Sequence, residues 1–200
     1  MHNSKPIVIA FLGKPGAGKG TQAKLLTEKL GLEYIGSGEL LRKRKQEGDY
    51  TGRKIAACID EGNLVPSPIV FSLWMDKLEA IKDSNKEISG ILFDGSPRKV
   101  LEARLLKEAI NWYEWNDNFK VIYLDIPNEE AVKRLLKRSQ IEGREDDDEE
   151  GIKTRLEWFE EEVRKVIEFY EKGNGHNLIR INGDQSVEEV YNEIISSLKL

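Results

Sequence analysis

The residues with the clearest chemical meaning lie in a glycine-rich turn near the amino terminus. The turn reads Gly-Lys-Pro-Gly-Ala-Gly-Lys-Gly-Thr over residues 13–21, and it directly follows the apolar run of residues 7–12. A buried strand that leads through such a turn into a helix directs backbone N–H groups toward phosphate oxygens. The spacing fits the P-loop pattern, in which Lys19 reaches the outer phosphates of a nucleoside triphosphate. We therefore expect phosphate contacts from Gly16, Ala17, Gly18, Lys19, Gly20 and Thr21.

One position of this turn departs from the general pattern. The residue after Lys19 is Gly20 rather than Ser or Thr, and the hydroxyl comes one position later, at Thr21. A glycine-rich turn without a ligand is the alternative interpretation. The flanking strand and helix disfavour it, because together they form the phosphate-binding arrangement.

A carboxylate, Asp94, follows the apolar run of residues 91–93. Phosphoryl transfer needs a magnesium ion that bridges the phosphates and is held by few protein ligands and several waters. A carboxylate at the carboxyl end of a strand beside the P-loop strand would anchor that ion, through water. The alternative role for Asp94 is to cap the turn of residues 95–98.

Arginines at the ends of predicted elements or beside loops supply a third signal. Guanidinium groups form bidentate bonds to phosphate oxygens and keep their charge, so several that converge on a transferring phosphoryl group would stabilise its transition state. Surface salt bridges are the alternative for each of them. The candidates are Arg42, Arg98, Arg134, Arg138, Arg144 and Arg155.

The elements that must position these side chains alternate along the chain. Strand-length apolar runs cover residues 7–12, 34–35, 91–93, 121–124 and 178–181. Helical periodicity covers residues 19–30, 38–47, 51–62, 67–82, 99–115, 128–138, 149–172 and 186–198. This alternation predicts an α/β fold with a parallel sheet covered on both faces. Residues 37–66 contain no convincing strand and predict a small helical insertion over one sheet edge, whereas residues 139–148 are polar and predict a loop.

Several helix ends are marked by their residues. Ser67 before Pro68 predicts an N-cap followed by proline at the first helical position, and Ser186 with Glu189 forms a capping box. Gly31 stands where a C-terminal glycine is expected. The aromatic side chains on predicted helices are expected to pack within the protein rather than to stack on bases: Trp112, Tyr113, Trp115, Trp158 and Phe159.

Composition limits the class of protein. Two hundred residues suit one domain, and the single cysteine, Cys58, excludes an internal disulfide and a multi-cysteine zinc site. The chain has no apolar run of membrane-spanning length, and its first residues are too polar for a signal peptide, so we expect a soluble cytoplasmic protein. A net charge of -5 argues against nucleic acid as the main partner, but it does not exclude small phosphate ligands.

Six pieces of the sequence, in order, resemble the adenylate kinase family and, more broadly, the nucleoside monophosphate kinases. They are residues 13–22, 37–42, 62–66, 94–98, 143–150 followed by Arg155, and 181–183. The Gly-Thr pair after Lys19 is this family's own form of the P-loop. The resemblance extends from about Ile7 to the carboxyl terminus.

The resemblance implies a P-loop three-layer fold with a parallel sheet of about five strands, in one domain over residues 1–200. The core would comprise residues 1–36, 67–138 and 149–200, with a monophosphate-binding lobe at 37–66 and a short lid at 139–148 that has no structural zinc. The implied activity is ATP + AMP ⇌ 2 ADP with Mg²⁺, in a monomer that has no membrane or nucleic-acid partner. Because the acceptor phosphate is already anionic, no general base is needed, and catalysis is positioning plus charge neutralisation.

The resemblance also implies roles for individual residues. The catalytic cations would be Lys19, Arg98, Arg138, Arg144 and Arg155. The donor side would add Arg134, Gly183 and Gln185 to the P-loop, and Asp94 would order water around Mg²⁺. The acceptor side would comprise Ser37, Gly38, Arg42, Asn63, Val65, Val70, Gly95, Arg98, Glu102, Arg144 and Arg155. Asp146 and Asp147 would hold lid arginines.

Two residues depart from the family. Ser96 replaces a phenylalanine, and Glu102 replaces the glutamine that accepts from the adenine amino group and donates to ring nitrogen N1. An ionised carboxylate accepts but cannot donate. Glu102 therefore suits guanine, or it is kept protonated by burial and mimics glutamine, or it faces solvent without touching the base.

These departures leave rival functions open. The first rival is a kinase for another monophosphate, namely GMP, CMP, UMP or dTMP. The others are a nucleotide-binding module without turnover and a P-loop kinase of a non-nucleotide metabolite. Retention of Lys19, Asp94, Arg98, Arg144 and Arg155 together argues against the module.

Overall fold

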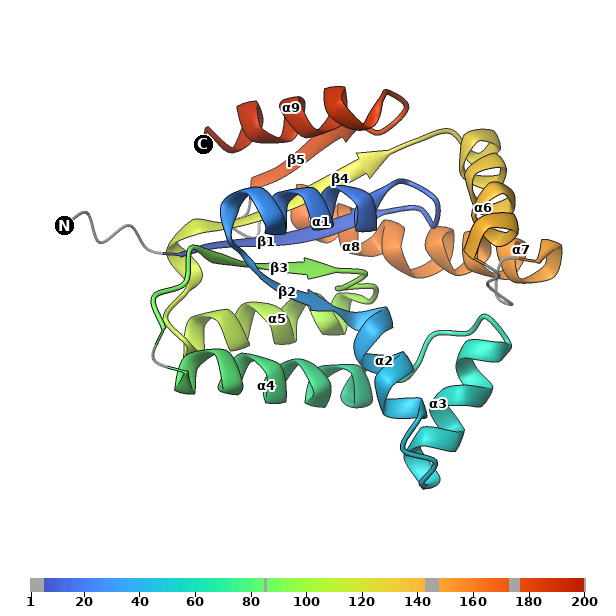
Figure 1. The fold of residues 1–200 in the computed structure, drawn as a ribbon, viewed down its shortest axis with the longest axis horizontal. Coiled ribbons are helices and arrows are strands. Elements are labelled where there is room, and N and C mark those ends of the chain that lie inside the picture. Colours follow the sequence, from blue (N-terminus) through green and yellow to red (C-terminus); the bar gives the residue numbers. More distant parts are fainter. Residues whose placement is uncertain (1–5, 85, 143–147, 173–176, 200) are drawn as a thin grey trace.

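The computed structural model describes residues 6–84, 86–142, 148–172 and 177–199. A five-stranded, all-parallel sheet forms its centre, with the strand order β2-β3-β1-β4-β5 (Figure 1). The strands are β1 (Ile7–Gly13), β2 (Glu33–Gly36), β3 (Gly90–Asp94), β4 (Phe119–Asp125) and β5 (Asn177–Asn182). The α/β fold and the number of strands confirm the sequence-based prediction.

Helices cover both faces of this sheet. They are α1 (Lys19–Leu30), α2 (Ser37–Lys45), α3 (Tyr50–Asp60), α4 (Ser67–Asp83), α5 (Val100–Trp112), α6 (Asn128–Glu142), α7 (Glu149–Trp158), α8 (Arg164–Glu171) and α9 (Val187–Leu198). A 3₁₀ turn, η1 (Asn116–Asn118), precedes β4, and a π-helical turn, η3 (Phe159–Val163), joins α7 to α8.

The alternation of side chains along β1 builds two hydrophobic cores. Val8, Ala10 and Leu12 join the core formed with α4, α5 and α8, whereas Ile9 and Phe11 join the core formed with α1 and α9. Every residue of β1 is buried, as expected for the central strand of a parallel sheet with helices on both faces.

The register places the candidate residues at one edge of the sheet. Ala10 pairs with Phe93, and Gly13 pairs with Leu124, so β1, β3 and β4 end side by side. The P-loop and Asp94 therefore lie next to each other at the carboxyl ends of the strands. Ligands bind at this edge in open α/β sheets.

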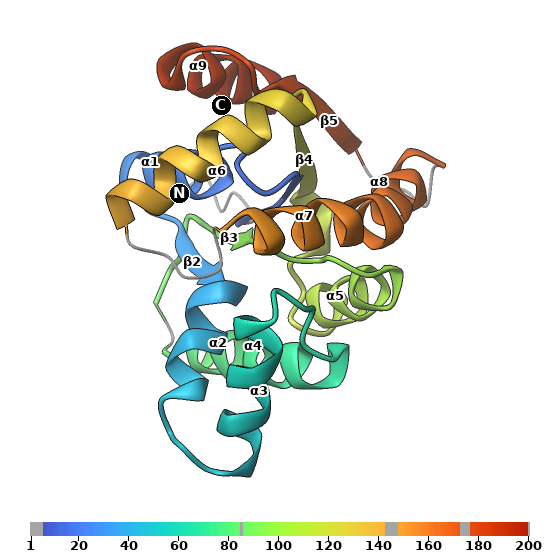
Figure 2. The same cartoon turned by 90° about the vertical axis from the view of Figure 1, so that its right-hand side faces the viewer.

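Two further parts of the chain flank this edge. Helices α2 and α3 pack on each other and stand out from the sheet beyond the edge strand β2, while α6 and α7 lie at the carboxyl ends of the strands (Figures 1 and 2). The helical insertion predicted for residues 37–66 is therefore present. That it forms a lobe for a monophosphate remains a prediction.

Helix ends agree with the sequence in most places. The capping box of Ser186 and Glu189 is formed, and Gly31 caps α1 in the left-handed conformation. Ser67 is the first residue of α4 and Pro66 is its N-cap, so the predicted cap is one residue too late. The predicted helix of residues 149–172 is interrupted by η3. Within the described residues, no helix combines the length and the apolar character needed to cross a membrane.

Candidate active site

The P-loop curls around the ammonium group of Lys19. The Nζ atom of Lys19 donates to the carbonyl oxygens of Gly13 and Lys14, at 2.7 Å each. Gly16 and Gly18 have φ angles of 83° and 85°, in the region that favours glycine. The loop therefore holds the predicted lysine at its centre.

The electrostatic environment of Lys19 is unusual. The pKa of its ammonium is lowered from 10.5 to about 8 in total, and desolvation by burial is the largest cause. Within this shift, Asp94 acts in the opposite direction, and the guanidinium groups of Arg98, Arg138 and Arg155 contribute to the lowering. The charges of three arginines that were predicted as site residues therefore all influence the pKa of the P-loop lysine.

Asp94 lies at the end of β3 and faces α1. Its Oδ2 atom accepts a hydrogen bond of 3.1 Å from the hydroxyl of Tyr34, and it would lie 3.5 Å from a Cβ atom on Gly20. This contact with Asp94 contributes, after desolvation, to raising the pKa of Tyr34 above its ordinary value. Within the described residues, no three His, Cys, Asp or Glu side chains gather as a metal cluster. A single carboxylate beside a phosphate loop suits Mg²⁺, which binds mainly through water and phosphate oxygens.

The arginines are held by bonds that point them toward one cleft. Nε of Arg98 donates to the carbonyl of Gly95 at 2.7 Å, and its guanidinium lies 5.1 Å from the ring centre of Trp158. Arg155 is buried, with 8% of its surface exposed. Arg134 donates to the carbonyl of Gly183 at 3.0 Å and pairs with Glu130 at 2.8 Å.

A cleft of about 1140 Å³ runs between the P-loop and the helical insertion. Most of the predicted site residues line it: Gly16, Ala17, Gly18, Lys19, Gly20, Thr21, Gly38, Arg42, Asn63, Val65, Asp94, Gly95, Arg98, Arg134, Arg138, Arg155, Gly183 and Gln185. Arg144 is a predicted site residue that lies outside the described residues, as do Asp146 and Asp147.

Three predicted acceptor-side residues lie beneath the surface of the cleft. Ser37, Val70 and Glu102 are 3%, 6% and 3% exposed. The hydroxyls of Ser37 and Ser96 are hydrogen-bonded, and Nε1 of Trp74 donates to Ser37 at 3.0 Å. Ser96 is thus part of a polar contact with a predicted acceptor-side residue, at the position where the resemblance implies a phenylalanine.

Glu102 does not face solvent, so that alternative is wrong. Its carboxylate accepts from the backbone N–H of Arg98 at 2.7 Å and from the hydroxyl of Ser67 at 3.1 Å. Glu102 lies in the first turn of α5, and its carboxylate connects this turn to the backbone of Arg98. The carboxylate therefore has a structural task in addition to any contact with a base.

Some residues of the site were not identified from the sequence. Tyr34 and Trp158 line the cleft, although Trp158 was expected only to pack. Trp112 is 78% exposed, so the expectation that its side chain packs within the protein is wrong. Lys14, within the P-loop, is buried. No spacing rule marks these residues, because their roles depend on contacts with distant segments.

The parallel sheet, the P-loop and the cation-lined cleft together define a phosphotransferase of the P-loop class. A model of the adenylate kinase family matches residues 11–175. The adenylate kinase of Leptospira biflexa is 40% identical over 190 residues, which cover 95% of this chain and 98% of that protein. Adenylate kinase 1 of a Nostoc species is 39% identical, with 95% and 97% covered, and adenylate kinase isoenzyme 1 of Gallus gallus is 37% identical, with 96% and 93% covered. The chain belongs to the adenylate kinase family.

Proposed function

We propose that the protein catalyses reversible phosphoryl transfer from ATP·Mg²⁺ to AMP, giving two ADP. The observation that carries this proposal is that Lys19, Arg98, Arg138 and Arg155 line the same cleft as Asp94. A phosphoryl group in transfer is the ligand that such a set of cations stabilises best. The similarity to curated adenylate kinases supports AMP as the acceptor.

The two sides of the cleft divide the substrates. We assign ATP to the side formed by the P-loop, Arg134, Arg138, Gly183 and Gln185, because backbone N–H groups at the start of α1 suit its phosphates. We assign the monophosphate to the side formed by the segment 37–66, Gly95 and Arg98. Lys19 of the P-loop and Arg155, which also lines the cleft, would neutralise the charge of the transferring group.

Charge and position account for the chemistry. The acceptor is an anionic phosphate oxygen, so it needs no general base. Asp94 would hold Mg²⁺ through water, and the ion when bound neutralises charge on the bridged phosphates. Arg98 would orient the acceptor, and the ammonium group of Lys19 would neutralise the charge that develops on the transferred group. Water must be excluded, and we assign this task to the lobe at 37–66 and the lid predicted at 139–148. The loop predicted for the whole of this segment is wrong for residues 139–142, which form the end of α6.

We further infer that the protein is a cytoplasmic monomer. The net charge of -5 supports the absence of a nucleic-acid partner. Sedimentation of the protein with and without ATP and AMP tests the oligomeric state, and a mass above that of one chain would contradict it.

Glu102 is the residue that bears on the acceptor base. Its two oxygens accept bonds from Arg98 and Ser67, and an ionised carboxylate offers no donor to N1 of adenine. Glutamine would keep an oxygen for the backbone of Arg98 and supply an N–H group. We expect Glu102→Gln to raise kcat/KM for AMP about threefold to tenfold, the effect of one gained hydrogen bond.

The decisive experiment measures turnover of ATP·Mg²⁺ with AMP, GMP, CMP, UMP and dTMP, for the natural protein and for Glu102→Gln. The matched control is Glu79→Gln, because Glu79 accepts a bond of 2.6 Å from the hydroxyl of Tyr113, away from the cleft. Fastest turnover with AMP supports the proposal. Faster turnover with another monophosphate assigns that base instead, and ATP binding without any turnover supports a binding module. An unchanged or lower kcat/KM for AMP in Glu102→Gln means that this residue does not read the base.

A further inference from the structure

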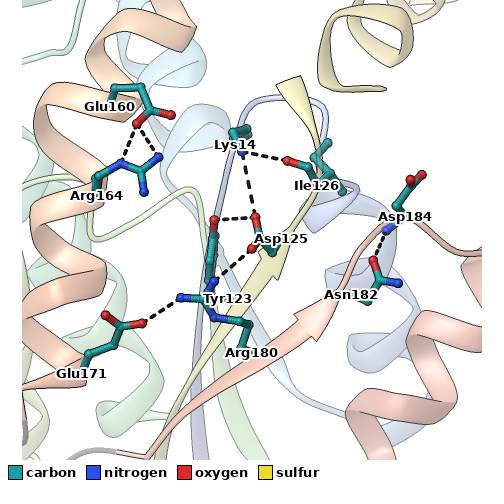
Figure 3. Close-up of polar contacts among 10 residues, drawn as sticks. All are labelled: Lys14, Tyr123, Asp125, Ile126, Glu160, Arg164, Glu171, Arg180, Asn182 and Asp184. Atoms are coloured by element: carbon teal, nitrogen blue, oxygen red, sulfur yellow. Dashed lines mark hydrogen bonds and ion pairs between the residues drawn. The ribbon is translucent and has the colours of Figure 1, made fainter. Parts of the chain in front are cut away.

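Lys14 is a loop residue whose side chain is almost fully buried. It follows β1 directly, yet only 7% of its surface is exposed. Its Nζ atom donates to the carbonyl oxygen of Ile126 at 2.7 Å and lies 3.9 Å from Oδ1 of Asp125 (Figure 3). A buried ammonium group is costly unless it is paired and hydrogen-bonded, so these contacts explain how the position tolerates a lysine.

The anionic partner of Lys14 is itself held in place. The hydroxyl of Tyr123 donates to Oδ1 of Asp125 at 2.7 Å, and Arg180 donates to Oδ2 at 3.0 Å (Figure 3). Arg180 in turn binds Glu171 at 2.8 Å, and Tyr123 carries a raised pKa, chiefly through burial, so it stays a donor. The carboxylate of Asp125 is therefore held at the end of β4 by contacts that do not involve Lys14.

Lys14 also lies close to the chain after α7. Its Nζ atom lies 5.5 Å from the ring centre of Phe159, which is fully buried at the start of η3. The preceding helix, α7, carries Arg155 and Trp158, and both line the cleft. Lys14 thus connects the P-loop with the end of β4 and with the helix that supplies a catalytic arginine.

The backbone of the same residue holds Lys19. The carbonyl oxygen of Lys14 accepts from Nζ of Lys19 at 2.7 Å and from the N–H of Ala17 at 3.1 Å. Because the side chain of Lys14 is buried and its Nζ atom is hydrogen-bonded at the far end, the position of the residue and of its carbonyl oxygen is restrained. A shift of that oxygen would move the ammonium group of Lys19 relative to the phosphates.

We propose that Lys14 is a positioning residue for the phosphate-binding loop. Its side chain fixes the loop to β4 and to Phe159, and its carbonyl then sets where Lys19 meets the donor phosphates. The proposal rests on the proposed function in taking ATP as the donor, but not on the identity of the acceptor. The reason for a lysine at this position is its reach to Ile126 and Asp125 rather than contact with substrate.

The test compares Lys14→Met with Lys82→Met. Lys82 is a matched control because its Nζ atom donates to the carbonyl of Tyr113 at 3.0 Å and lies 5.4 Å from the ring centre of Trp115, outside the cleft. We expect Lys14→Met to weaken ATP binding about tenfold in calorimetry and to raise KM for ATP in proportion. KM for the monophosphate should stay within about twofold. Lys82→Met should change neither constant, and Lys14→Arg should recover most of the ATP affinity because its guanidinium can also donate to Ile126.

Two results would overturn the proposal. One is unchanged ATP affinity in folded Lys14→Met, and the other is an equal loss in Lys82→Met. If Lys14→Met does not fold, Asp125→Asn serves in its place, since it removes the charge partner and keeps an acceptor for Tyr123. For Asp125→Asn we expect a smaller loss of ATP affinity than for Lys14→Met. An unchanged ATP affinity in Asp125→Asn contradicts the proposal. Because binding is read directly, ATP affinity remains informative even if the protein does not phosphorylate AMP.

Discussion

At the scale of single residues, Lys19 is a buried cation whose charged form is disfavoured in the free protein. Its ammonium group has two backbone acceptors and one nearby carboxylate, but burial and three guanidinium groups lower its pKa to about 8. The unfolded chain therefore binds more protons than the folded chain between about pH 8 and its ordinary pKa of 10.5. Through this lysine, the free protein gains stability as the pH rises through that window. The ligand-free site is thus electrostatically strained in its cationic form.

Binding of ATP should reverse this shift. The phosphates favour the charged ammonium, so at pH 8 the complex should take up about half a proton through Lys19. Calorimetric titration in buffers of different ionisation enthalpy measures the number of protons. The affinity should be highest below pH 8 and should decline as the pH rises above it. Lys19→Met should remove both effects, and the same proton uptake in that variant would contradict the assignment.

At the scale of elements, the P-loop is shaped by its contact with α6. Gly16 and Gly18 have nearly the same positive φ, but a Cβ atom on Gly16 would lie 2.8 Å from the carbonyl oxygen of Ala131, whereas one on Gly18 would have open space. Of these two glycines, Gly16 therefore combines an unusual backbone conformation with close packing, and Gly18 does not.

This difference predicts unequal effects of two similar substitutions on the free protein. Gly18→Ala should cost about 1–2 kcal/mol through backbone strain. Gly16→Ala should cost about 1–3 kcal/mol more, because the loop must move away from α6. Urea unfolding of both variants without nucleotide gives the comparison. Equal losses of stability in the two variants would show that the loop can move away from Ala131 without a loss of unfolding free energy.

Most elements of the fold could be predicted from the sequence because local signals agree with the packing. The apolar run of residues 7–12 is the central strand, and the capping box at Ser186 starts α9 as expected. The π-turn after α7 could not be predicted. Its residues continue a helical pattern, and nothing local marks the change of hydrogen bonding at Phe159.

At the scale of the whole molecule, the prediction of the site was less complete. P-loop and arginine motifs have fixed spacing, so their residues could be named in advance, and most of them line the cleft. Lys14 could not be recognised, because its partners Ile126 and Phe159 are more than a hundred residues away along the chain. Glu102 was identified as a departure, but its contact with the backbone of Arg98 emerged only from the packed structure.

Trp158 joins three separate parts of the molecule. Its Nε1 atom donates to the carbonyl of Gly62 at 3.1 Å, its ring lies under the guanidinium of Arg98, and it belongs to α7. Gly62 precedes the segment that enters α4, and a Cβ atom on it would lie 3.6 Å from Thr154 of α7. The indole therefore connects the helical insertion, the arginine proposed to orient the acceptor, and the helix of Arg155.

This connection predicts a specific effect on the acceptor side. Trp158→Phe keeps an aromatic ring under Arg98 but removes the bond to Gly62, a loss of about 1 kcal/mol, so KM for AMP should rise about fivefold. KM for ATP should change less than twofold, since the P-loop is not touched. AMP should also change the tryptophan fluorescence of the natural protein. That change should disappear in Trp158→Phe and persist in Trp112→Phe, whose tryptophan is 78% exposed at the end of α5. An equal rise of both KM values, or a fluorescence response that survives in Trp158→Phe, would show that this side chain does not couple the insertion to the acceptor arginine.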